Sequence, residues 1–418
     1  MQKNIFANRV FANLLCTVIL SSCVPAAGPI EPTATSAITV QPANTQQSFT
    51  METRCLETDS NWHDKLKAQD ILIINRYFPL SDTVAIDFNA KQERVLNGKN
   101  ENFISPAVSP DHKWLFFADE TFADENDESG QINLSILPSS LSAKKKVTAL
   151  RNGWNIEFYW QNNQEVLISL LGKAWGPEHF VILNPFTGEY QELQSDYPSI
   201  APNDAWQWEV SGRTMFNNDL SYVIYPTLSD KYPEPGYTIW NTKTHAEKAF
   251  IPGSVYNTPK WAPDGAKFAV ALPKHEIYVE ELFTVGLDEK TSQLTDLNEK
   301  YPNIDIGNMS WSPDGKHIVF WALTNPNDNS ISHLFLLSMD TGEVIDYCIP
   351  GKQDNFTLGN FSYASLLSPV WSSDSRYIAF ATVAKDGNIQ TVVVDIMEAK
   401  AFQVAEKMQP VGWMIKEP

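Results

Sequence analysis

The sequence predicts an all-β fold, a closed ring of seven four-stranded sheets of the kind called a β-propeller. Three observations lead to this prediction. A short turn motif recurs at intervals of roughly 50 residues, which suits four short strands and their turns. Beyond the first 50 residues the hydrophobic pattern is that of strands. Finally, there are seven outer strand pairs but six copies of the motif, and the C-terminus offers the missing first strand.

The motif places an aromatic residue three positions before an Asp and an apolar strand after it. Three copies are clear: 261–270 (WAPDGAKFAV), 311–320 (WSPDGKHIVF) and 371–380 (WSSDSRYIAF). Weaker copies begin at Val108, Trp160 and Phe216. Pro presets φ, Gly accepts a positive φ, and Asp bonds the amides that a turn leaves free.

These residues are therefore expected to be structural rather than catalytic. The turn carboxylates are Asp111, Asp219, Asp264, Asp314 and Asp374, with Asn163 in the remaining copy. The aromatic residues expected to pack between blades are Trp160, Trp261, Trp311, Trp371 and, near the C-terminus, Trp413.

The number of blades depends on how the ring closes. The strand pair at 83–96 precedes the first motif, and 71–78 reads as a further strand before it. The stretch 409–415 resembles the approach to each repeat Trp, so we expect it to close the ring beside 71–78. Six blades with an N-terminal extension is the alternative.

The first 22 residues have the form of an export signal. Lys3 and Arg9 are basic, and the apolar run 10–20 is shorter than the roughly 20 residues that span a bilayer. LSSC at 20–23 resembles a bacterial lipobox. The resemblance implies cleavage before Cys23 and its lipidation, hence an extracytoplasmic protein anchored by acyl chains to the cell membrane or outer membrane. An ordinary signal peptide is the alternative.

Two segments separate this signal from the ring. Residues 23–50 hold four prolines and one charge, so a disordered tether is expected. Residues 51–70 form an N-terminal segment with the one helix candidate, within 59–70, which Ser60 would cap and which is expected to extend no further than one or two turns. The propeller is expected over 71–418.

Cys55 and Cys348 remain as a pair after the signal is removed and Cys23 is lipidated. An exported protein can oxidise such a pair, which would pin the N-terminal segment to the ring. Two unpaired buried thiols remain the alternative at this point.

The Trp-Ser-Pro-Asp-Gly turn and its apolar strand resemble the repeat of TolB-like β-propeller proteins over about residues 70–415, best around Asp264, Asp314 and Asp374. TolB is periplasmic and docks other envelope proteins, and similar repeats accompany the hydrolase domain of prolyl-oligopeptidase-like peptidases. Only about 20 residues separate the expected tether from the first strand of the ring, whereas TolB has an α/β domain before its propeller. No Gly-x-Ser-x-Gly elbow occurs in the sequence. The resemblance therefore implies the fold and not an activity.

The net charge and the missing motifs exclude several classes of partner and cofactor. With 31 basic and 50 acidic residues the net charge is −19, which disfavours nucleic acid because phosphate binding needs a basic surface. No cofactor is expected, since P-loop, dinucleotide and His-pair metal motifs do not occur. Asp124, Asn126 and Glu128 form a weak Ca²⁺ candidate, with a solvated acidic loop as the favoured alternative. His112 and His317 follow motif Asp residues and are expected to be exposed.

The segments that approach each repeat aromatic are expected to line the mouth of the central channel. Their charges are few, with Glu157 and Lys260 the exceptions. Trp206 and Trp208 would share one side of a strand and serve in blade packing or in gripping a ligand. This composition fits a binding funnel better than a glycosidase site, which needs two carboxyls roughly 5–10 Å apart.

Together these features predict a non-enzymatic binding or assembly module for an envelope or extracellular protein or a glycan. A hydrolase or lyase acting on a sugar or lactone at the channel mouth is one alternative. The other is a lipoprotein with an obligate membrane-protein partner, which an exposed apolar patch would favour.

Overall fold

The computed structural model describes residues 49–76, 82–98, 101–121, 131–151, 155–171, 178–193, 214–227, 232, 234–253, 258–273, 279–324, 332–351, 368–383 and 388–417. The chain divides into Met1–Ala34, which lies outside these residues, and Thr35–Pro418, which contains all of them. Among the described residues the regular secondary structure consists of β-strands and one short 3-10 helix, η3 (Leu297–Glu299).

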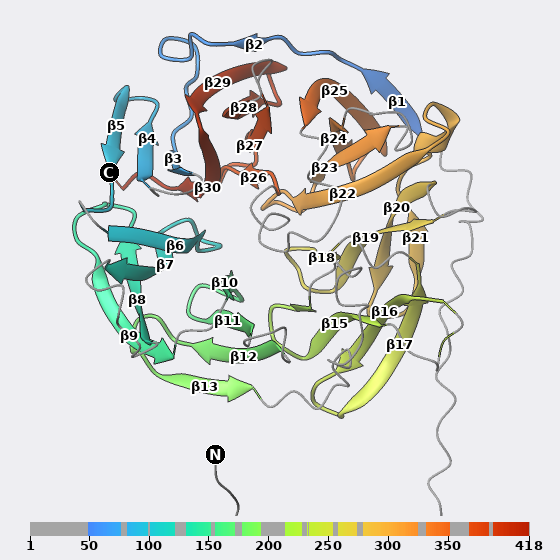
Figure 1. Ribbon diagram of the computed structural model, residues 1–418. Helices are drawn as coiled ribbons and strands as arrows, with labels where there is room; N and C mark the ends of the chain where they lie inside the picture. Colours follow the sequence, from blue (N-terminus) through green and yellow to red (C-terminus); the bar gives the residue numbers. More distant parts are fainter. Residues whose placement is uncertain are drawn as a thin grey trace, which may run out of the picture. The chain divides into compact units, whose positions relative to one another are not determined.

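Seven mainly antiparallel sheets form the blades of a propeller, as the sequence predicts (Figure 1). In each blade the strands are given from the innermost outward. Blade 1 is β30 (Met408–Met414), β3 (Ile71–Arg76), β4 (Thr83–Asp87) and β5 (Gln92–Val95). Blade 2 is β6 (Glu101–Val108), β7 (Trp114–Thr121), β8 (Gln131–Pro138) and β9 (Lys145–Arg151). Blade 3 is β10 (Asn155–Trp160), β11 (Val166–Leu171), β12 (Glu178–Leu183) and β13 (Tyr190–Leu193).

The remaining four blades follow in chain order. Blade 4 is β14 (Met215–Phe216), β15 (Tyr222–Thr227), β16 (Gly236–Asn241) and β17 (Ala246–Pro252). Blade 5 is β18 (Lys260–Trp261), β19 (Lys267–Pro273), β20 (Glu280–Gly286) and β21 (Thr291–Gln293). Blade 6 is β22 (Ile304–Trp311), β23 (His317–Thr324), β24 (Ser332–Ser338) and β25 (Glu343–Gly351), and blade 7 is β26 (Val370–Trp371), β27 (Tyr377–Val383), β28 (Ile389–Asp395) and β29 (Lys400–Glu406).

The C-terminal strand closes the ring. β30 pairs antiparallel with β3, with Leu72 opposite Trp413 and Ile71 opposite Met414. Blade 1 therefore combines the last strand of the chain with three strands from its N-terminal part, and the six-bladed alternative is wrong. Such closure ties the two ends of the ring together within one sheet.

The N-terminal segment adds a fifth strand to two blades. β1 (Thr50–Thr53) runs parallel to β25, and β2 (Thr58–Asp59) runs parallel to β29. We call residues 49–59 the strap. Because its two strands cover the outer edges of blades 6 and 7, those edges are paired within the chain.

The helix expected at 59–70 does not form beyond one turn. The Leu66 amide donates to the Trp62 carbonyl over 2.9 Å, and the chain then continues extended into β3. Trp62, Leu66 and Ala68 are all buried in the hydrophobic cluster between blades 7 and 1. Burial of these three side chains therefore outweighs the weak local preference for a helix.

The core consists of one hydrophobic cluster at each interface between neighbouring blades. The second strand of a blade is buried on both faces, because each face packs on a different neighbour; β19 is buried from Phe268 to Leu272. This explains why these strands read as continuous apolar runs rather than as alternating ones.

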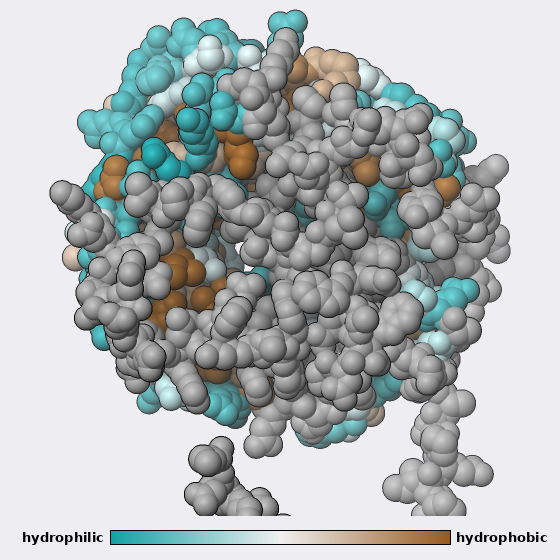
Figure 2. All heavy atoms as spheres, viewed as in Figure 1, coloured by the Kyte–Doolittle hydropathy of each residue, from teal (hydrophilic) through white to brown (hydrophobic). Residues whose placement is uncertain are grey.

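The described surface carries few apolar side chains. Figure 2 shows hydrophilic residues around the rim where described residues are visible, with apolar ones in small separate spots. The exposed large hydrophobic residues of the described part are Val95, Tyr190 and Met397, on β5, on β13 and in the turn after β28. Such scattered residues do not form the patch that an obligate apolar partner would need.

Candidate functional site

The repeated Asp residues lie in the turns between first and second strands and bond their own turns. In all five copies Oδ1 accepts the backbone N–H two residues later, for example from Ala266 to Asp264 over 3.0 Å. In three copies a Ser two residues before the Asp also donates its hydroxyl over 2.6 Å. These contacts use the carboxylates to shape turns, as sequence reasoning expected.

The residue after each Asp has a positive φ, between 57° and 69°. Gly265 and Gly315 adopt this conformation without a Cβ penalty. His112, Leu220 and Ser375 occupy the same position in the other copies, where a side chain makes it strained. The glycine of the motif therefore marks a backbone requirement that the copies without glycine meet at a cost.

The repeat tryptophans join neighbouring blades through their indole N–H groups. Trp311 donates to the Lys260 carbonyl over 3.0 Å, and Lys260 directly precedes the repeat Trp of blade 5. The other four bonds follow the same rule: Trp160 to Ala107, Trp261 to Met215, Trp371 to Ser310 and Trp413 to Val370. The aromatic column thus links innermost strands around the ring.

Two interfaces lack this bond, because the aromatic position holds Phe216 or Val108. At the interface of blades 3 and 4, the Tyr159 carbonyl accepts from the Gln161 side-chain amide over 3.3 Å instead. At the interface of blades 1 and 2, Val108 packs so close to Gly412 that a Cβ there would lie 2.7 Å from Val108 Cγ2. These two copies thus lack the indole link between blades and have different local contacts in its place.

Neither His112 nor His317 is exposed as expected; both are half-buried. His112 Nδ1 lies 2.7 Å from the Trp413 carbonyl and helps to close the ring. Burial lowers the pKa of His317, whose Nδ1 has no hydrogen-bond partner in the described part of the chain. Their positions near blade interfaces explain the error, since the turn motif alone does not reveal the neighbouring blade.

The innermost strands place two of the expected channel residues together. Glu157 and Tyr159 lie two residues apart on the regular strand β10, and the Tyr159 hydroxyl donates to the Glu157 carboxylate. Lys260 lies on β18 in blade 5 directly before the repeat Trp, the position that Tyr159 holds on β10. The described inner strands thus place a hydroxyl–carboxylate pair in blade 3 and an ammonium in blade 5.

The strap is covalently fixed to blade 6. Cys55 and Cys348 form a disulfide, so the sequence alternative of two free thiols does not hold. Beside it, the amides of Arg54 and Leu56 donate to the Asp346 and Tyr347 carbonyls. The chain that leaves the ring toward the N-terminus is therefore held at the outer wall of blades 6 and 7.

A polar network around the buried Asp346 carboxylate lies next to the disulfide. The Asp346 carboxylate, 1% exposed, accepts from the Tyr301 hydroxyl over 2.6 Å and from the Cys348 amide over 2.7 Å, and lies 3.2 Å from His333 Nδ1. Burial alone would raise the pKa of Asp346, but the bonds from His333, Tyr301 and Cys348 outweigh it and lower that pKa.

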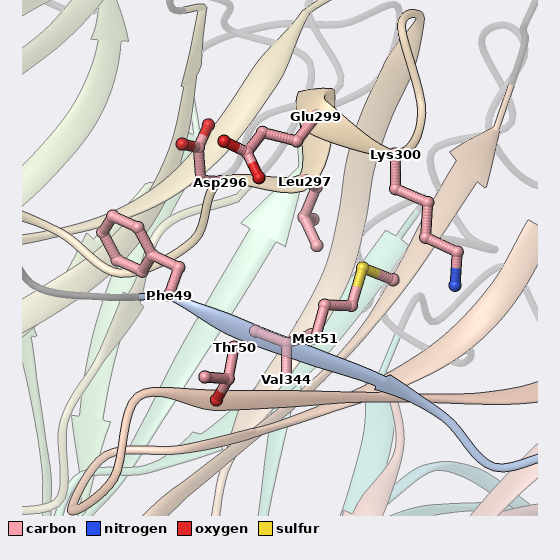
Figure 3. A pocket seen from close by; sticks show the side chains of 8 residues that line it. All are labelled: Phe49, Thr50, Met51, Asp296, Leu297, Glu299, Lys300 and Val344. Atoms are coloured by element: carbon pink, nitrogen blue, oxygen red, sulfur yellow. The ribbon is translucent and has the colours of Figure 1, made fainter.

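A pocket of about 320 Å³ opens between the strap and the η3 turn (Figure 3). Its lining residues are Phe49, Thr50, Met51, Asp296, Leu297, Glu299, Lys300 and Val344. No sequence signal marked them, because they come from three segments that meet only when the strap is docked. The pocket lies at the outer part of blades 5 and 6, not at the axis.

The η3 side of this pocket is held by the buried Glu281. Its carboxylate accepts from the Thr295 hydroxyl over 2.6 Å and from the amides of Leu297 and Asn298 over 2.9 and 3.0 Å. Burial raises the pKa of Glu281, and these bonds offset that rise only in part.

Several sequence candidates lie outside the described residues. They are the lipidation candidate Cys23, the Ca²⁺ candidates Asp124, Asn126 and Glu128, and the pair Trp206 and Trp208. Within the described ranges, no group of three or more His, Cys, Asp or Glu side chains could hold a metal ion. None of the helical segments in those ranges is long and apolar enough to cross a membrane.

The fold and these contacts define a closed seven-bladed β-propeller with an N-terminal strap. No known protein family matches the sequence, and no curated protein matches it. Solved structures similar to the chain include TolB from Acinetobacter baumannii, with 12% identity, coverage of 88% of this chain and 97% of that one, and a TM-score of 0.46.

Two further similar structures are a propeller domain of a protease and a lyase. The β-propeller domain of the Trilobed protease from Pyrococcus furiosus shares 13% identity, with 86% and 97% coverage and a TM-score of 0.49. Oligogalacturonate lyase from Vibrio parahaemolyticus shares 12%, with 81% and 87% coverage and a TM-score of 0.48. Likeness at this level concerns the fold and says nothing about activity or partners.

Proposed function

We propose that this chain is a lipid-anchored, extracytoplasmic docking module that binds an envelope or extracellular protein or a glycan. The observation that carries the proposal is the attachment of the strap. The predicted tether meets the ring at Thr50, where β1 begins, and the strap is fixed there by two parallel strand pairings and a disulfide. These contacts would fix the point at which the flexible tether joins the folded domain.

Two further features support this compartment and role. A disulfide is stable in the oxidising environment that an exported protein meets. The rigid ring would present preformed loops, and the tether would raise their effective concentration near the membrane. The net charge of −19 keeps the body repelled from anionic lipid, so acyl chains on Cys23 would supply the attachment.

The test has two parts. Cys23→Ala should move the protein from the membrane to the soluble fraction, whereas the matched Cys16→Ala change in the apolar run should leave it on the membrane. Continued membrane association of Cys23→Ala would refute the anchor. Mild crosslinking of the anchored protein, followed by mass spectrometry, should then capture a stoichiometric envelope or extracellular partner.

An empty crosslinking result with an intact tether would contradict docking to a protein. It would leave a glycan or small ligand, and it would direct attention to the hydrolase or lyase hypothesis. The Glu157–Tyr159 pair would then be the first place on the described inner strands to examine for activity.

A further inference from the structure

The pocket between the strap and η3 is a second feature of the ring, distinct from its axis. Its floor consists of the buried side chains of Leu297 and Val344, and Phe49 and Met51 form half-buried walls. A volume of about 320 Å³ lies at the lower end of the range for small-ligand sites.

The pocket is held rigidly from both sides. On one side β1 pairs with β25, which places Met51 opposite Val344, and the nearby disulfide fixes the strap. On the other side the Glu281 carboxylate holds the backbone of η3. Between the two, the Lys300 ammonium contacts the Thr53 hydroxyl. A site built in this way exists before any ligand arrives, which lowers the entropic cost of binding.

Charge in the pocket is divided between its two ends. Figure 3 shows the carboxylates of Asp296 and Glu299 on the same side as the Phe49 ring, while the Lys300 side chain extends away from them. The Lys300 ammonium is engaged by Thr53 and lies 5.3 Å from the centre of the Tyr301 ring. In the described part of the chain, no ion pair or hydrogen bond occupies the Glu299 carboxylate.

We infer that this pocket binds an alkylammonium or alkylguanidinium group. The cation would lie between the Glu299 carboxylate and the Phe49 ring, which attracts a positive charge to its face. Its aliphatic stem would lie along the half-buried Met51 side chain, and this would remove apolar surface from water. The negative net charge of the protein draws cations toward it. This inference does not depend on membrane anchoring.

The chemistry has two natural sources, a free polyamine or a Lys or Arg side chain of a partner protein. We would titrate the full chain with 1,5-diaminopentane and with the peptide Ala-Lys-Ala, and follow binding by calorimetry. Both are compared with 1,5-pentanediol, which has the stem without the charge. We expect saturable binding of at least one amine that weakens with salt, and no binding of the diol. Preference for the diamine indicates a free polyamine, and preference for the peptide a basic side chain.

Variants connect binding to the pocket. Glu299→Gln should weaken binding about tenfold, whereas the matched Glu192→Gln change on the exposed strand β13 should leave it unchanged. Phe49→Ala removes the ring without removing a charge and should also weaken binding. The inference is overturned if neither amine saturates below about 10 mM, or if Glu192→Gln weakens binding as much as Glu299→Gln does. Because crosslinking tests the proposed docking separately, the two proposals can fail independently.

Discussion

The interface between blades 5 and 6 differs from that between blades 3 and 4 in how the same repeat is used. At the first, the Trp311 indole donates to the Lys260 carbonyl of the neighbouring blade. At the second, Phe216 has no indole, and Gln161 supplies a donor from within its own blade.

This difference shows that the residue at the aromatic position of a copy decides the contact at its interface. Copies with a Trp are linked to the neighbouring blade by the indole N–H, including the weaker copy at Trp160, while the copies with Phe216 and Val108 have other local contacts. Stability should therefore be uneven around the ring, and local opening is expected first between blades 3 and 4.

Removing residues 408–418 should have the largest effect, because it deletes β30 and opens the interface between blades 7 and 1. We expect the free energy of unfolding, measured with urea, to fall by more than about 5 kcal/mol. Removing residues 416–418 alone keeps β30 and serves as the control. An unchanged unfolding midpoint in the longer deletion would refute closure by the C-terminal strand.

Trp311→Ala probes the strong interface directly. The side chain is 8% exposed, so its loss should destabilise the protein by about 3–5 kcal/mol in chemical unfolding. The matched change Trp160→Ala, at a half-buried position of the interface between blades 2 and 3, should have a smaller effect. A loss below about 1 kcal/mol for Trp311→Ala would mean that the interface does not depend on this column.

The double replacement of Cys55 and Cys348 by Ser tests how much the attachment of the strap stabilises blade 6. The disulfide closes a loop across 293 residues, and its removal should lower stability by about 2–4 kcal/mol. Hydrogen exchange should show faster exchange at β1 and β25, with blade 3 unaffected. Uniform acceleration through all blades would instead indicate that the strap stabilises the ring as a whole.

Two buried carboxylates of the strong sector should respond to pH in opposite directions. The folded-state pKa of Asp346 is lowered, so its contribution is present above its unfolded value and is lost as pH falls through the folded pKa. The folded-state pKa of Glu281 is raised, so its contribution is present at low pH and is lost as pH rises through the folded pKa.

We therefore expect Asp346→Asn to cost about 1–3 kcal/mol at neutral pH and less at low pH. The destabilisation caused by Glu281→Gln should instead be greatest at low pH. Urea unfolding across a pH series measures both, with Glu192→Gln as an exposed control. Parallel pH profiles for the two buried variants would contradict the assigned pKa directions.

Gly315→Ala should have the smallest effect of this series. Its φ is 69°, and an added Cβ would meet nothing within 4 Å, so the change isolates backbone strain. Thermal unfolding should show a loss of about 1–2 kcal/mol. Leu220 holds the matching position of blade 4 with a φ of 57°, which shows that the ring tolerates this strain. No loss at Gly315 would mean that the turn relaxes freely.

Sequence reasoning predicted most of the architecture because the repeat is local. Within about ten residues, each copy contains the turn, the aromatic residue and the buried strand, so the seven blades and the closing role of the C-terminus could be counted. At 59–70 it allowed one or two helical turns, and only one forms, because Trp62 and Leu66 pack in the cluster between blades 7 and 1. It failed for His112, whose partner carbonyl belongs to Trp413.

By itself, the sequence determined the fold class, the structural role expected of the repeated Asp and Trp residues, and the prediction of export. Turn chemistry and strand patterning act between neighbours in the chain, so they can be read without coordinates. Only the tertiary structure decided that Cys55 meets Cys348, that the strap extends blades 6 and 7, and that Phe49, Glu299 and Val344 line one pocket. Those contacts join segments hundreds of residues apart, and their partners are selected by packing of the whole ring.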